Sequence, residues 1–128
     1  RVLSQGKIVI RTNFSSPPTH GASIAATVLG DAALRQLWVA ELGGMRDRIK
    51  AMRVRLVSGL EAAGITDMGF IATQVGMFSY SGLTRDQMVA LRAQHGVYGT
   101  DKGRICVAAL NEGNVEYVCR AIAEVRGR

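Results

Sequence analysis

The sequence has few of the residues that mark disulfide-stapled, zinc-binding or membrane-spanning proteins. Its two cysteines, Cys106 and Cys119, show no paired spacing and have no histidine beside them as a further zinc ligand. No apolar run reaches the roughly 20 residues that a membrane-spanning helix needs, and no signal-peptide pattern opens the chain. We therefore expect buried free thiols, no metal site, no membrane partner and a cytoplasmic protein.

Aromatic residues are also scarce, which bears on the meaning of the positive charge. The chain carries 16 Lys and Arg against 10 Asp and Glu, a formal charge of +6, but only three tyrosines and three phenylalanines could stack on bases. Six of the basic residues, between Arg35 and Arg55, share one segment with acidic residues, as on a solvated helix face. The charge therefore predicts no nucleic-acid partner.

Nucleotide-binding loops and catalytic triads are missing as well. The 15 glycines form neither G-x-G-x-x-G after a strand nor G-x-x-x-x-G-K-[ST]. His20 and His95 have no Ser/Asp or Cys/Asn arrangement around them that indicates a triad. The sequence thus gives no support for dinucleotide binding, nucleoside triphosphate binding or triad-based hydrolysis.

The chain does contain enough apolar sequence for a packed core, since 48% of its 128 residues are hydrophobic. We divide it into three parts. Residues 1–30 should hold the end of a strand, a loop over residues 12–20 that the paired prolines enforce, and a short buried helix from Ala22 to Leu29. Residues 31–64 should form one long helix, and residues 65–128 should form a small domain.

The long helix is predicted by an apolar stripe that follows a capping aspartate, Asp31. Apolar residues recur every three or four positions through the segment: Leu34, Trp38, Leu42, Met45, Ile49, Met52, Leu56 and Leu60. About 30 helical residues span about 45 Å, more than one small domain usually needs. We therefore expect this helix to link two domains, with a bend or a close packing contact at Gly43 and Gly44.

The last part of the chain mixes short strand-like runs with helical ones. Residues 70–71, 76–80 and 104–109 are strand-like, and residues 84–95 and 114–125 have helical spacing. Thr84 with Gln87 forms a capping box, and Gly96 is placed to end that helix. The predicted fold class is therefore α+β, with a long linking helix followed by a small α/β unit that contains a short sheet.

Arg104 is the first candidate binding residue. It opens an apolar strand, where its guanidinium needs an acidic partner, and a bound carboxylic acid would match its planar fork of donors. From the residues alone, a structural ion pair with Asp67, Asp86 or Glu112 is the simpler explanation. Both explanations stay open at this point.

Arg11 and the serines that follow it are a weaker candidate group. Arg11 ends the apolar run 8–10 and precedes the proline loop, which would hold its guanidinium at a fixed place. Ser15 and Ser16 could donate hydrogen bonds within a pocket. An ordinary surface arginine and ordinary loop serines explain the same residues.

Three stretches together resemble the aspartate/aromatic amino-acid aminotransferase family of fold-type I pyridoxal-phosphate enzymes. Residues 10–22 (IRTNFSSPPTHGA) are similar to that family's I-R-x-N-[YF]-S-x-P-P-x-H-G-A. Residues 76–83 (GMFSYSGL) are similar to its G-M-F-[ST]-[FY]-[ST]-G-L, and residues 103–110 (GRICVAAL) to its G-R-[IV]-[NS]-V-A-G-[ML]. The stretches occur in the family's order, so the resemblance implies the carboxy-terminal portion of such an enzyme, with roughly two-thirds of it before Arg1.

The resemblance implies a role for each of five residues. Arg104 would pair with the α-carboxylate of every amino-acid and oxo-acid substrate, and Arg11 would reach across a homodimer interface to a side-chain carboxylate. Phe78 would pack beside the substrate, while the loop with Ser15 and Ser16 would line the neighbouring subunit's pocket. The long helix would join a large cofactor domain, of which residues 1–30 are a remnant, to a small mobile domain.

The implied function is amino transfer between aromatic amino acids, or aspartate, and 2-oxoglutarate, with pyridoxal phosphate bound in the complete enzyme. Ser16 stands where dicarboxylate-specific members commonly have asparagine, which favours aromatic substrates. The chemistry needs a Schiff-base lysine, and neither Lys7, Lys50 nor Lys102 lies in the family's Ser-x-[FY]-Ser-Lys context. We therefore expect no catalytic and no cofactor-binding residue in this chain, which alone would be inactive. A non-catalytic carboxylate-binding or oligomerisation module is the alternative.

Overall fold

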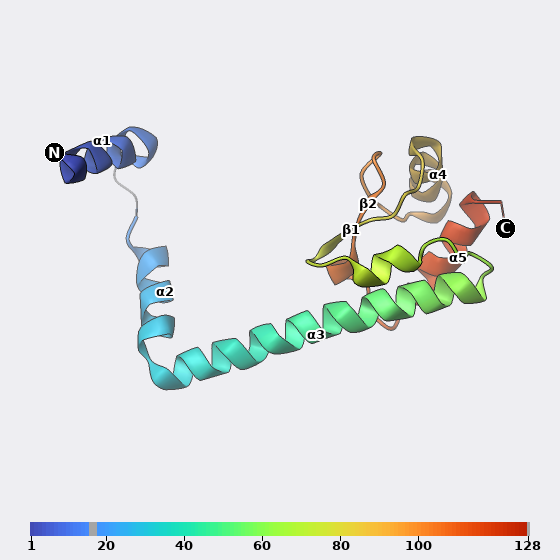
Figure 1. Cartoon of the computed structure of the whole chain (residues 1–128), viewed down its shortest axis with the longest axis horizontal. Coiled ribbons are helices and arrows are strands. Elements are labelled where there is room, and N and C mark those ends of the chain that lie inside the picture. The colour runs from blue at the N-terminus through green and yellow to red at the C-terminus, as the bar shows by residue number, and fades with distance from the viewer. Residues whose placement is uncertain (16–17, 128) are drawn as a thin grey trace. The chain divides into compact units, whose positions relative to one another are not determined.

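The computed structural model describes residues 1–15 and 18–127 and divides into two compact units, Arg1–Leu42 and Gly43–Arg128. The first unit contains α1 (Val2–Phe14), α2 (His20–Gly30) and the first turns of α3 (Ala32–Ala62). The second contains the rest of α3 and the strands, as the colours of Figure 1 allow the reader to follow. Ser16, one of the predicted site residues, lies outside the described residues.

Helix α1 occupies the place where the sequence predicted the end of a strand. A strand needs a neighbour for its backbone N–H and C=O groups, and the described first unit contains no strand, whereas a helix pairs these groups within itself. The helix continues to Phe14, so the predicted loop begins later than residue 12. The predicted strand end is therefore wrong, and Arg11 lies in the last turn of a helix.

Helix α2 confirms the predicted short helix but not its burial. The Ser23 and Thr27 hydroxyls donate to carbonyls four residues earlier, at 2.9 Å and 2.8 Å. No side chain of α2 is buried, and Ile24 and Leu29 are each 53% exposed. The small apolar residues predicted an enclosed helix, but within the described part of the first unit no other element covers it.

Helix α3 is one continuous element of 31 residues, as the apolar stripe predicted. The side-chain carboxylate of Asp31 accepts a hydrogen bond from the Leu34 N–H at 2.9 Å, which confirms the predicted N-cap. Gly43 and Gly44 do not interrupt the helix, and the two units divide between Leu42 and Gly43. A Cβ added at Gly44 would meet no atom within 4 Å, so the close contact expected there does not form among the described residues.

Burial of the α3 stripe is confined to its second half. Met52, Leu56 and Leu60 are at most 5% exposed, whereas Trp38 and Leu42 are 45% and 48% exposed. The spacing of apolar residues therefore marks one face of the helix correctly, but only the part that belongs to the second unit is covered within this chain.

The second unit folds two helices and a small sheet against the carboxy-terminal half of α3 (Figure 1). Its elements are η1 (Gly69–Thr73), β1 (Phe78–Tyr80), α4 (Arg85–His95), β2 (Arg104–Cys106), η2 (Val107–Ala109) and α5 (Val115–Val125). Strands β1 and β2 pair antiparallel, and α4 packs beside α5. This arrangement confirms the predicted α+β fold, with a long helix followed by a small unit that contains a short sheet.

All three predicted strand-like runs are shorter than expected or absent. The run 76–80 forms a strand only over Phe78–Tyr80. Residues 70–71 lie in the 3-10 helix η1, where Ile71 is fully buried. The run 104–109 forms a strand only as far as Cys106, because the chain then turns into η2. Ile105 and Val107 are buried like Ile71, whereas Phe70 is 43% exposed. A short apolar run does not distinguish a strand from a helical turn.

The structure confirms the capping residues predicted for α4. The Thr84 hydroxyl accepts from the Gln87 N–H at 3.3 Å, and the Gln87 side chain accepts from the Thr84 N–H at 2.9 Å. Gly96 ends α4 in the left-handed region with φ of 62°. Both ends of α4 are therefore specified by local sequence. None of the described helices is both long and apolar enough to cross a bilayer.

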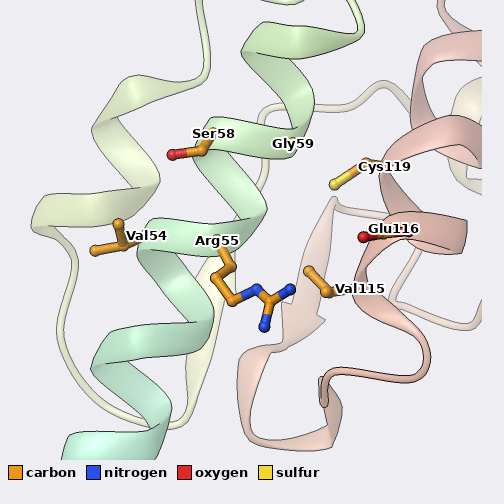
Figure 2. A pocket seen from close by; sticks show the side chains of 7 residues that line it. All are labelled: Val54, Arg55, Ser58, Gly59, Val115, Glu116 and Cys119. Carbon is orange, nitrogen blue, oxygen red and sulfur yellow. The ribbon is translucent and has the colours of Figure 1, made fainter.

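Gly59 of α3 faces Cys119 of α5 (Figure 2). A Cβ at position 59 would lie 2.6 Å from the Cys119 sulfur, which is shorter than van der Waals contact allows. The thiol is buried and donates to the Leu56 carbonyl at 3.6 Å, so it fills the space that the glycine leaves. Position 59 therefore requires glycine for packing.

We predict that Gly59→Ala lowers the free energy of unfolding by about 1–3 kcal/mol, because the added methyl group overpacks the helix contact. Gly44 lies on the same helix but has open space around it. Gly44→Ala should instead raise the free energy of unfolding by roughly 0.5–1 kcal/mol, because alanine loses less conformational entropy on folding than glycine does. Urea unfolding measures both. The Gly59→Ala penalty should shrink in a Cys119→Ala background, and an equal penalty in both backgrounds would contradict the proposed contact.

Candidate carboxylate-binding site

The outward face of the small sheet gathers the candidate residues of the second unit. In the register of the two strands Phe78 lies opposite Cys106 and Tyr80 lies opposite Arg104. Directly opposed residues of an antiparallel pair share a face, as do alternate residues of one strand. These four side chains therefore lie on the same face, while Ser79 and Ile105 between them are buried on the other.

Arg104 and Phe78 are in direct contact. The guanidinium carbon of Arg104 lies 4.9 Å from the centroid of the Phe78 ring, within the range of a cation–π interaction. An open pocket of about 220 Å³ lies beside them, lined also by Tyr98, Gly99, Thr100 and Cys106. The structure thus brings together two of the predicted site residues at a hollow with a fixed positive charge.

The strand that carries Arg104 is held by a tight turn. The Thr100 hydroxyl accepts from the Arg104 N–H at 3.1 Å, and the Thr100 N–H donates to the Arg104 carbonyl at 3.0 Å. Gly103 has φ of 84°, and its carbonyl accepts from both the N–H and the hydroxyl of the buried Ser81, at 2.8 Å and 2.7 Å. The backbone on both sides of Arg104 is therefore fixed.

The acidic residues that could have paired with Arg104 have other partners. Asp67 makes a bidentate ion pair with Arg126, with distances of 2.6 Å and 2.8 Å, and Glu112 pairs with Arg55 at 2.6 Å. Asp86 forms no ion pair with Arg104 either, and no carboxylate of residues 1–15 and 18–127 does so. The structural alternative for Arg104 is therefore not formed, and its donors face the pocket side of the sheet.

Arg53 is the residue of this site that sequence reasoning missed. The charge pattern predicts a solvated helix face for Arg53, but this residue is only 2% exposed. Its guanidinium donates to the carbonyl oxygens of Ile71 at 3.2 Å, Gly76 at 2.6 Å and Phe78 at 2.8 Å, and to the Ser79 hydroxyl. Burial lowers the pKa of its guanidinium from the ordinary value, although an arginine stays charged. One signal was available: Arg53 falls between Met52 and Leu56 on the buried stripe.

Arg11 and Ser15 lie in the first unit. Both are exposed, and the Ser15 N–H donates to the Arg11 carbonyl at 2.9 Å where α1 ends. Ser15 has φ of 56°, a left-handed conformation that residues other than glycine rarely adopt, so the chain leaves the helix abruptly. A positive side chain in the last turn also suits the helix dipole.

The described residues do not form a site for a Schiff-base cofactor or a metal. Lys7, Lys50 and Lys102 are all exposed, and no lysine lines the pocket beside Arg104. A Schiff-base lysine needs a desolvated or charge-tuned position to act as a nucleophile, which none of the three has. No cluster of three or more His, Cys, Asp and Glu side chains that could bind a metal occurs in the part of the chain described.

A second hollow, between α3 and α5, has no comparable binding group (Figure 2). Its volume is about 300 Å³, and two charged residues line it, Arg55, which already pairs with Glu112, and Glu116. Burial, together with the nearby Glu116 carboxylate, raises the pKa of the Cys119 thiol, which disfavours the reactive thiolate. The lining residues therefore give this hollow no reactive thiolate.

The chain is similar to known proteins along almost its whole length. The family described as aminotransferase class I and II matches residues 1–122. An aspartate aminotransferase of Pseudomonas aeruginosa is 56% identical and an aromatic-amino-acid aminotransferase of Escherichia coli 47% identical, each over 126 residues. The crystal structure of an aromatic-amino-acid aminotransferase from Burkholderia pseudomallei, covalently bound to pyridoxal phosphate, aligns with a TM-score of 0.92 and 60% identity. Each alignment covers 98% of this chain and 32% of the relative.

We predict that Arg104 directs carboxylates to Cys106, the partly exposed cysteine in the same pocket. The ratio of alkylation rates with iodoacetate and iodoacetamide should fall in Arg104→Gln by up to about fivefold, the effect of an exposed ion pair of 0.2–1 kcal/mol. Iodoacetamide corrects for any change in the thiol itself, and Cys106→Ser identifies the labelled residue. An unchanged ratio in Arg104→Gln would show that the guanidinium does not attract carboxylates.

Proposed function

Because this chain belongs to the class I and II aminotransferase family, we propose that it is the carboxy-terminal portion of an enzyme that transfers amino groups between aromatic amino acids, or aspartate, and 2-oxoglutarate. The similarity to aspartate and to aromatic-amino-acid aminotransferases supports both substrate classes. The chain spans 32% of the length of these relatives, so the activity is proposed for the complete enzyme. We expect that enzyme to be a cytoplasmic homodimer.

The unpaired fork of Arg104 over the Phe78 ring carries this proposal. All amino acids and 2-oxo acids share a carboxylate, and a guanidinium can bind it through two parallel hydrogen bonds. The ring of Phe78 restricts the guanidinium on one side without using its in-plane donors. Arg104 would therefore bind what every substrate has in common, and Phe78 would contact the bound substrate.

Arg11 is proposed to distinguish between substrates. A second arginine suits the side-chain carboxylate of aspartate, and its exposed position at the end of α1 leaves the guanidinium accessible. Ser15, where α1 ends, and Ser16, next in sequence, would line a pocket in the neighbouring subunit. An aromatic substrate offers no second carboxylate, so Arg11 contributes to one substrate class only.

Pyridoxal phosphate would supply the electron sink for amino transfer in the complete enzyme. The lysines of this chain do not suit the cofactor, so we assign the residues described here to substrate recognition and not to the reaction. Helix α3 would link the cofactor domain to the small domain that carries Arg104. The chain alone is then expected to bind carboxylates weakly and to catalyse no amino transfer.

A carboxylate-binding or oligomerisation module without catalysis would use Arg104 in the same way. The enzyme and the module would share this site and would differ in the sequence that the gene encodes upstream of it. An upstream, in-frame Ser-x-[FY]-Ser-Lys segment and amino transfer by the complete gene product would support the enzyme. A gene product that binds 2-oxoglutarate but holds no pyridoxal phosphate would support the module.

In the complete enzyme, Arg104→Leu should lower kcat/KM for all substrates by the equivalent of about 2–5 kcal/mol, because we expect the rest of the enzyme to enclose the carboxylate pair that is open to solvent in this chain. Steady-state kinetics with aspartate and with phenylalanine measure the loss. Arg85→Leu is the matched control, since Arg85 is an exposed arginine of the same unit whose only ion pair among the described residues is a 3.7 Å contact with Asp101. Full activity of Arg104→Leu toward both substrates would refute the assignment.

Arg11→Leu should separate the two substrate classes. The drop in kcat/KM should be larger for aspartate than for phenylalanine by at least about 1.4 kcal/mol, or tenfold, because only aspartate carries a second carboxylate. The same pair of assays measures this difference. Equal losses for aspartate and phenylalanine would mean that Arg11 acts on the fold and not on selectivity.

A further inference from the structure

Arg53 connects the buried interior of the second unit to the carboxylate-binding face. Its guanidinium comes from α3 and reaches the backbone of β1 and of the segment before it. One terminal nitrogen donates to the Ile71 carbonyl and the Ser79 hydroxyl, and the other donates to the carbonyls of Gly76 and Phe78. Both terminal nitrogens are thus used twice, and no buried side-chain nitrogen or oxygen among the described residues lacks a partner.

The acceptors around Arg53 are backbone dipoles and a hydroxyl, with no carboxylate among them in the described chain. Burying a charge without a counterion costs free energy, which hydrogen bonds to backbone carbonyls can offset. Arg53 therefore acts through these hydrogen bonds and not through an ion pair. Three of the four acceptors instead fix the course of residues 76–79, and the fourth, the Ile71 carbonyl, ties η1 to the same guanidinium. A lysine, with three donors on a single atom, could not reproduce this planar arrangement.

Phe78 is contacted by two arginines, one at its backbone and one at its ring. Its carbonyl oxygen accepts from Arg53 at 2.8 Å, and its ring lies 4.9 Å from the guanidinium carbon of Arg104. Phe78 also stands opposite Cys106 in the sheet register, so its backbone position sets the spacing between β1 and the Arg104 strand. A shift of the Phe78 carbonyl would move the ring against which Arg104 rests.

We propose that Arg53 is a positioning residue of the carboxylate-binding site, which holds β1 so that the Phe78 ring keeps the Arg104 guanidinium oriented toward the ligand. This inference rests on the proposed function of Arg104. It assigns to a buried residue, which never touches the substrate, control over how well the site binds a carboxylate.

The test uses the 128-residue chain with Arg53→Met and Arg53→Lys. Two quantities are followed: the NMR shifts that the Phe78 ring current induces on the Arg104 side chain, and the iodoacetate-to-iodoacetamide rate ratio at Cys106. We expect Arg53→Met to lose the ring-current shifts and the preference of up to about fivefold for iodoacetate. Arg53→Lys should restore part of both.

Arg48→Met is the matched control. Arg48 lies on the same helix and also donates to backbone carbonyls, those of Leu110 at 2.9 Å and Ala108 at 3.0 Å, but to none in β1. It should lower stability while the Arg104 shifts and the rate ratio stay close to wild type. If Arg48→Met abolishes both signals as Arg53→Met does, the effect of Arg53 is general destabilisation and the proposal is overturned.

Folding is checked in every variant by the protection of Cys119, which is buried at 3% exposure, against alkylation. If Cys119 is not protected in Arg53→Met, that variant is unfolded and Ser79→Ala is tested in its place. Ser79→Ala removes one hydrogen-bond acceptor of Arg53 and keeps the guanidinium charge. A folded variant that retains both signals overturns the proposal. If the ring-current shifts depend on Arg53 while the wild-type chain shows no preference for iodoacetate, Arg53 positions Phe78 and the proposed function of Arg104 fails instead.

Discussion

The guanidinium of Arg53, buried beneath the small sheet, is the interaction on which the rest of the second unit depends. A buried arginine without a carboxylate is tolerated only when most of its donors find acceptors, and here three carbonyls and one hydroxyl provide them. These acceptors come from η1, from β1 and from Gly76 between them, and both elements contain few backbone hydrogen bonds of their own because each is so short. The side chain of Arg53 thus provides hydrogen bonds that a longer strand would form with its neighbouring strand. It also joins α3 to β1.

Arginine has two opposite roles in this unit. Arg53 is enclosed and its terminal donors are satisfied within the protein, which makes it part of the scaffold. Arg104 is exposed, and its guanidinium carbon lies 4.9 Å from the centroid of the Phe78 ring; under the proposed function its planar donors would bind a ligand. Residue type alone cannot separate these roles, because both residues neighbour apolar sequence. What separates them is the presence of carbonyl acceptors for one and of a pocket for the other.

Local signals in the sequence predicted the elements whose determinants lie within a few residues. The capping box at Thr84 and Gln87, the left-handed Gly96 and the Asp31 cap all act over one helical turn, and each was read correctly. The site residues Arg104 and Phe78 came from motifs, and their contact follows from the strand register. Burial and strand pairing depend instead on segments far along the chain. This is why α1 was mistaken for a strand end, the run 70–71 for a strand, and Arg53 for a solvated residue.

The difference in packing between the two units also determines what each candidate arginine means. The second unit encloses its own core, with Leu56, Ile71 and Leu91 fully buried, so the setting of Arg104 is specified by residues of this chain. The first unit buries none of the side chains of α1 or α2, so nothing in its described residues fixes the direction of the Arg11 guanidinium. Under the proposed function, recognition of the shared carboxylate would depend on the sheet that carries Arg104. Recognition of a second carboxylate by Arg11 would depend on whatever packs against α1.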